Sequence, residues 1–98
     1  MLLIAGINLA TAQIISSNNI KASWNFPGGT VAYSIVSADI PAGSSFAWSV
    51  DSKSVTDGIS NNGQTITLPL TNKTRSGEVT ITFADNSSQT VTFSIEPK

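Results

Sequence analysis

Residues 78–95 have the sequence EVTITFADNSSQTVTFSI. Apolar side chains occupy every second position on both sides of the central turn, at Val79, Ile81 and Phe83 before it and at Val91, Phe93 and Ile95 after it. A period of two residues is typical of β-strands with one buried and one solvated face. Asp85, Asn86, Ser87 and Ser88 are residues that favour turns. The stretch therefore predicts a β-hairpin.

The same alternation extends back along the chain to Lys21. Four further apolar runs have this spacing: Ala22, Trp24 and Phe26; Val31, Tyr33 and Ile35; Phe46, Trp48 and Val50; Ile66, Leu68 and Leu70. Pro27-Gly28-Gly29 predicts a tight reversal after the first run, and residues 38–43 and 55–64 are expected to be loops or turns. Pro69 cannot donate a ladder hydrogen bond, which predicts a sheet edge or a bulge there.

Six strands that each carry three inward apolar side chains need two sheets, because a single sheet would leave one apolar face in water. The first 15 residues suit a further strand better than a helix. We therefore expect an all-β fold, an immunoglobulin-like antiparallel two-sheet β-sandwich of about seven strands, formed by residues 1–98 as a single freestanding domain. The N-terminal residues 1–15 are either its first strand or an arm that contacts a partner.

Composition excludes several classes of function. Five Lys and Arg against six Asp and Glu give a net charge of -1, which provides no basic field for nucleic acid. The chain has no His and no Cys, so the usual general base, zinc ligands and thiol nucleophile are missing. We predict no enzyme activity, no cofactor and no metal site. Asp57, Asn61 and Asn62 carry oxygen ligands suited to calcium, but we expect them to be solvated turn residues.

Two other residue groups have alternative interpretations. Trp24, Phe26 and Tyr33 are expected to face the core because of their period of two, as is Trp48; an exposed face on the first three would instead be a platform for stacking sugars. Lys21, Glu78 and Asn86 have the residue types of an intramolecular isopeptide cross-link, without a diagnostic spacing.

The N-terminal segment is apolar and uncharged. Its large apolar residues, Leu2, Leu3, Ile4, Ile7 and Leu9, are candidates for contact with a protein partner. Ala10-Thr11-Ala12 has the small-x-small form of a signal cleavage site, which would give a mature chain starting at Gln13. No Lys or Arg precedes the apolar stretch, and Gly6 and Asn8 interrupt it, so we expect the segment to be retained. It is too short to span a membrane, and we predict no membrane insertion.

Residues 68–95 also resemble the end of a known domain family. The order LPLTNKTRSGEVTITF, a polar turn and VTFSI is similar to the closing hairpin of BACON domains, with Asn72, Thr74, Arg75, Gly77, Val79 and Ile81 at the matching positions. The usual terminal Val-Thr-Gln is replaced by Ser-Ile-Glu-Pro-Lys. The resemblance implies an immunoglobulin-like fold. BACON domains occur in secreted proteins of gut Bacteroidetes, where they are thought to bind sugars or mucin, and in phages that infect these bacteria.

The expected function is that of a non-enzymatic structural or binding protein. We expect a bacteriophage virion protein that decorates or supports the capsid or tail, with a shell protein as its partner and with self-association as a further mode of contact. The alternative is a secreted or cell-surface bacterial module that binds a glycan. This alternative predicts cleavage after Ala12 and an exposed aromatic side chain among Trp24, Phe26, Tyr33 and Trp48.

Overall fold

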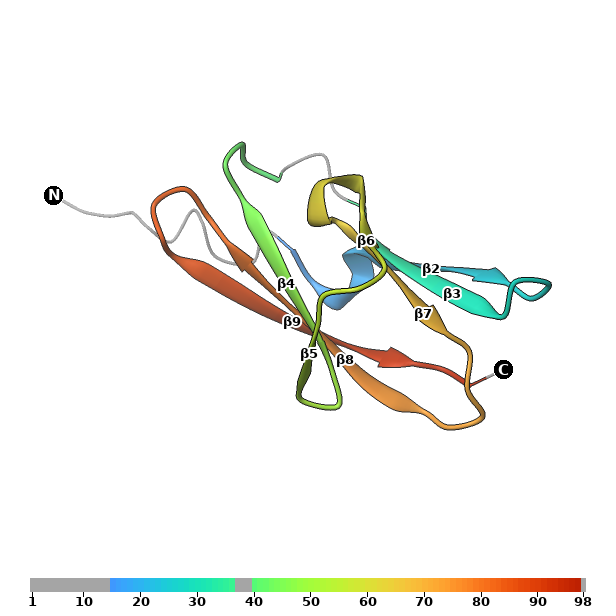
Figure 1. The fold of residues 1–98 in the computed structure, drawn as a ribbon. Coiled ribbons are helices and arrows are strands. Elements are labelled where there is room, and N and C mark those ends of the chain that lie inside the picture. Colours follow the sequence, from blue (N-terminus) through green and yellow to red (C-terminus); the bar gives the residue numbers. More distant parts are fainter. Residues whose placement is uncertain (1–14, 37–39, 98) are drawn as a thin grey trace, which may run out of the picture.

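The computed structural model describes residues 15–36 and 40–97, and these form an almost entirely β structure (Figure 1). The strands are β2 (Ile20–Asn25), β3 (Thr30–Ile35), β4 (Ser45–Val50), β5 (Lys53–Val55), β6 (Ile59–Ser60), β7 (Thr65–Pro69), β8 (Arg75–Thr82) and β9 (Ser88–Ile95). Two 3-10 turns, η2 (Ser17–Asn19) and η3 (Asn61–Gly63), are the helical elements of the described chain. The all-β prediction is confirmed.

The strands form two four-stranded sheets. The first sheet has the order β2-β3-β7-β6 and the second has the order β5-β4-β8-β9. Every pair of neighbouring strands is antiparallel. β3 and β4 follow each other in the chain but belong to different sheets, so the chain crosses from the first sheet to the second after β3. Each sheet therefore combines segments that are far apart in the sequence.

A single hydrophobic core lies between the sheets. The first sheet contributes Val31, Tyr33, Ile35, Ile66 and Leu68, and the second contributes Trp48, Val79, Ile81, Val91 and Ile95; Ile15 and Phe83 are buried with them. These positions alternate along each strand with exposed or half-buried residues, as the period of two predicts. Full burial of one such aliphatic side chain contributes about 1.5–3 kcal/mol, so this core accounts for most of the favourable energy of the fold.

The predicted hairpin of residues 78–95 is present, with its turn at the expected residues. Phe83 N–H donates to the carbonyl of Ser87 at 2.8 Å and Asn86 N–H donates to the carbonyl of Phe83 at 2.9 Å. Asn86 has a φ of 73°, a conformation that Asn tolerates better than most residues. Turn chemistry visible in the sequence therefore fixes the register of β8 and β9.

Two predictions about residues 55–70 need correction. The segment expected to be loop contains the end of β5, the two residues of β6 and the turn η3, because Ile59 pairs with Ile66 and is half-buried against the core. The strand that ends at Pro69 lies inside its sheet, between β3 and β6. Pro69 is tolerated because β6 reaches only Thr65 and Ile66, so no β6 residue pairs with β7 at Pro69.

Candidate functional site

The β2–β3 hairpin forms one end of the molecule (Figure 1). Two exposed aromatic side chains lie there. Trp24 is 37% exposed and Phe26 is 60% exposed. Trp24 pairs with Val31, which places it on the core-facing side of its sheet, but β2 is an edge strand and the tryptophan lies near its end. Phe26 follows the last residue of β2 and belongs to the turn. The expectation of a core-facing position is therefore wrong for Phe26, whereas Trp24 lies on the core-facing side of β2 but is not buried.

Hydrogen bonds hold the turn that carries Phe26. The Asn25 side chain accepts a hydrogen bond from Gly28 N–H at 3.2 Å, and the carbonyl of Phe26 accepts one from Gly29 N–H at 3.1 Å. Leu70 N–H, at the end of the neighbouring strand, donates to the carbonyl of Gly29 at 2.9 Å. Gly29 has a φ of +70°, which favours glycine. The aromatic pair is thus presented on an ordered support.

Tyr33 and Trp48 do not join this surface. Tyr33 is buried, its ring centroid lies 4.9 Å from that of Phe93, and its hydroxyl accepts a 3.4 Å hydrogen bond from Glu96 N–H. Trp48 is also buried, meets Phe93 edge to face at 5.9 Å and donates from its indole N–H to the carbonyl of Gly63 at 2.8 Å. The prediction of a core position is confirmed for these two residues.

The predicted partner contacts Leu2, Leu3, Ile4, Ile7 and Leu9 lie outside the described residues, as does the Ala12–Gln13 bond. The described chain starts at Ile15, whose side chain is buried in the core. Its N–H donates to the Gln89 side-chain oxygen at 3.3 Å, and the Gln89 amide donates back to the Ile15 carbonyl. Gln89 occupies an inward position of β9, so this polar side chain anchors the start of the described chain.

A second, polar surface was not predicted from the sequence. An open hollow of about 500 Å³ crosses the second sheet and is lined by Ser17, Ser52, Thr74, Arg75, Ser76, Gly77, Glu78, Thr92, Phe93 and Ser94. Most of these side chains carry hydroxyl groups, and Glu78 is the carboxylate among them. Arg75 donates to the carbonyl of Pro69 at 2.8 Å, whereas its buried Nε has no hydrogen-bond partner among the described residues. The sequence feature that could have predicted this polar surface is the row of Ser and Thr residues at alternate, outward positions of β8 and β9.

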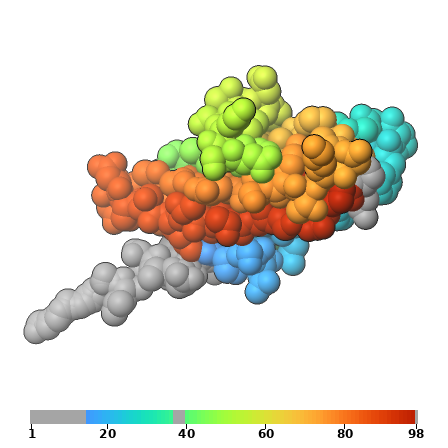
Figure 2. Space-filling view, turned by 90° about the horizontal axis from the view of Figure 1, so that it is seen from below, coloured from blue at the N-terminus to red at the C-terminus, as the bar shows by residue number. Residues whose placement is uncertain are grey.

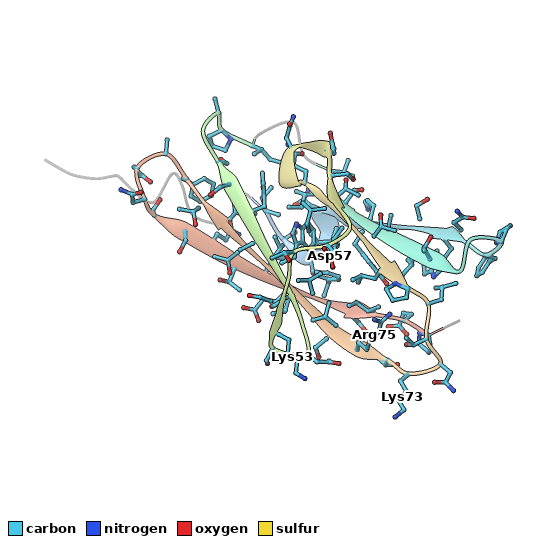
Figure 3. The ribbon with its side chains drawn as sticks, viewed as in Figure 1. Lys53, Asp57, Lys73 and Arg75 are labelled. Carbon is cyan, nitrogen blue, oxygen red and sulfur yellow. The ribbon has the colours of Figure 1, made fainter. Side chains whose placement is uncertain are left out.

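Charged side chains are spread over separate elements. Lys53 on β5 and Lys73 in the β7–β8 connection point outward at different places, and Arg75 lies on β8 (Figure 3). Of the residues with isopeptide chemistry, Lys21 lies at an outward position of β2 in the first sheet and Glu78 at an outward position of β8 in the second, so these two are on opposite outer faces. Within residues 15–36 and 40–97, no group of three or more acidic residues forms a metal-binding cluster. None of the helical turns in this part of the chain is long and apolar enough to cross a membrane.

Comparison with known proteins gives no further guide to the site. No protein family, curated protein or solved structure matches the chain.

Proposed function

We propose that the protein is a non-enzymatic binding protein with an immunoglobulin-like sandwich. The strand order supports this fold. When the eight described strands are lettered A, B, C, C′, D, E, F and G in chain order, the sheets become A-B-E-D and C′-C-F-G, the order of immunoglobulin-like domains. Trp48 on strand C is buried at the position where such sandwiches place a core tryptophan. The residues that resemble a BACON domain, 68–95, include the end of strand E and all of strands F and G.

The proposed partner is a protein shell, the capsid or tail of a bacteriophage virion. The observation that carries this proposal is the pair of exposed aromatic side chains at the β2–β3 hairpin end, Trp24 at the end of β2 and Phe26 in the hydrogen-bonded turn. Aromatic side chains that are already ordered lose little conformational entropy on binding and supply much of the energy of protein interfaces. The low net charge is compatible with close packing on a shell. In this proposal the hairpin end contacts the shell.

The test uses virions purified from the native source. We expect the chain to co-sediment with intact particles, and a phage genome encoding Phe26→Ser to yield particles with at least about tenfold less of the protein, because an interface anchor contributes 1.4 kcal/mol or more. Val36→Ser is the matched control, since Val36 is 54% exposed and lies at the opposite end of β3. Equal loss in both variants, or absence of the protein from purified virions, would refute the shell proposal.

The second candidate is a secreted or surface-located glycan-binding module, and the same geometry favours it. Trp24 and Phe26 offer stacking faces, and the Asn25 side chain lies between them in the sequence. In this case the mature chain starts at Gln13 in a secreted or envelope fraction. Glycan-array binding that is retained by Val36→Ser and lost in Phe26→Ser would select this candidate over the shell.

A further inference from the structure

The four edge strands of the two sheets differ in how well they are protected from pairing. β5 has three residues including Lys53, β6 has two residues, and β2 carries Lys21. β9 has eight residues, SQTVTFSI, with no charge and no proline. Short length, lysine and proline are the usual features that prevent an edge strand from pairing with another chain. Among the described edges, β9 alone has none of them.

The side of β9 away from β8 carries a groove. Within the described residues, β8 is the strand hydrogen-bonded to β9, and the start of the described chain lies beside it (Figure 2). Ile15 bonds to the Gln89 side chain, and no backbone–backbone bond joins residues 15–19 to β9. A hollow of about 250 Å³ remains there, lined by Ile15, Ser16, Ser17, Gln89, Thr90, Val91 and Thr92. Among the described residues, the edge of β9 is therefore not paired through the backbone, and Ile15, Ser16 and Ser17 line the groove beside the middle of the strand.

The residue pattern of β9 is complementary to itself. In an antiparallel pair centred on Thr92, Val91 faces Phe93 of the other strand and Thr90 faces Ser94. Each position then meets one from the same side of the sheet. The hydroxyl row continues outside, and inside Val91 meets Phe93 while the Gln89 amide lies opposite Ile95. Glu96 lies opposite Ser88 in this register, so no like charges oppose one another. A closed two-fold contact of this kind needs only one surface patch.

We propose that β9 is the site at which a second copy of this chain adds an antiparallel strand, in the register that places Thr92 opposite Thr92. The two second sheets then form one continuous eight-stranded sheet across the two-fold axis. Backbone hydrogen bonds supply the affinity, and the alternation of apolar and hydroxyl side chains selects the register. This surface is separate from the aromatic hairpin end, so a dimer presents two copies of that end.

The absence of cysteine from the chain allows a direct test in the full-length protein. In the proposed register the Cα atoms of opposite residues are about 4.5–5.5 Å apart, within the range that a disulfide spans, so we expect Thr92→Cys to form a disulfide-linked dimer with oxidised glutathione. Thr80→Cys is the control, because Thr80 lies on the same outer face one strand further in, opposite Thr90. We expect linkage of Thr92→Cys to be at least about tenfold faster. Thr90→Cys is expected to link to Ser94→Cys rather than to itself.

Sedimentation velocity of the unmodified chain gives an independent measurement. We expect a dimer at micromolar concentrations, weakened at least about tenfold by Thr92→Lys, which opposes two ammonium groups, and unchanged by Thr80→Lys. Near-ultraviolet circular dichroism of the aromatic side chains, which include the buried Trp48 and Tyr33, verifies that each variant is folded. A monomeric chain, together with equal linkage rates for the cysteine variants at 92 and 80, would overturn the proposal. Linkage of Thr90→Cys to itself would overturn the register.

Discussion

At the scale of single residues, the close contact of Gly77 and Phe93 leaves no room for a side chain at position 77. The two residues pair across β8 and β9, and a Cβ atom at Gly77 would lie 2.4 Å from the Phe93 ring. That ring also packs against Tyr33 and Trp48, so it has little room to move. We predict that Gly77→Ala lowers the free energy of unfolding by about 1–3 kcal/mol, as measured by urea denaturation. Ser76→Ala, on the exposed face of the same strand, is expected to change it by less than about 0.5 kcal/mol.

The carboxyl group of Asp85 provides a second prediction at this scale. It accepts hydrogen bonds from the hydroxyl and the backbone N–H of Ser87, and these lower its pKa below the usual 3.8. Because the folded pKa is the lower one, the stabilisation is present above the unfolded pKa and is lost as the pH falls through the folded value. We expect an NMR titration of the Asp85 carboxyl carbon to show a lowered pKa that moves back up in Ser87→Ala. An identical titration in both proteins would contradict the assigned cause.

At the scale of elements, alternation of apolar residues predicted all six described strands of five or more residues, and it predicted burial best where both edges of a strand are paired. β3 and β8 are examples, since they are central and their inward positions are buried. The same rule failed at Trp24 and Phe26 because burial there depends on the edge position of β2 and on where the strand ends, which the local sequence does not specify. β6 was missed for a related reason. Its two residues form a strand only through pairing with β7, a contact between separate segments.

The attachment of β6 to β7 can be tested at Gly58. Thr67 N–H donates to the carbonyl of Gly58 at 2.9 Å, and a Cβ atom at Gly58, which has a φ of +78°, would lie 2.4 Å from the carbonyl oxygen of Thr67. Gly29 has a similar φ of +70° with nothing within 4 Å of its Cβ position. We predict that Gly29→Ala costs only backbone strain, about 1–2 kcal/mol, and that Gly58→Ala costs clearly more in thermal unfolding. If both variants lost the same stability, the contact of Gly58 with Thr67 would not restrict the position of β6.

At the scale of the whole molecule, the sandwich depends on residues that precede its first described strand. Among the strands that the structure describes, none is hydrogen-bonded to both sheets, so the separation of the sheets is set by the side chains between them. Ile15 precedes β2, yet its side chain is almost fully buried in the shared core. Gln89 secures it by bonding both backbone groups of Ile15. The start of the described chain is thereby joined to the second sheet, whereas β2 that follows it belongs to the first.

This linkage predicts that truncating Ile15 weakens the whole sandwich rather than one local segment. Ile15→Ala leaves a cavity between the sheets and is expected to lower the free energy of unfolding by about 2–4 kcal/mol. Hydrogen exchange is the decisive measurement, because protection should fall in β3 and in β9 together if both sheets depend on this side chain. Val36→Ala, at an exposed apolar residue, is expected to leave protection in both strands unchanged. A loss confined to β2 in Ile15→Ala would mean that the residue secures only the strand that follows it.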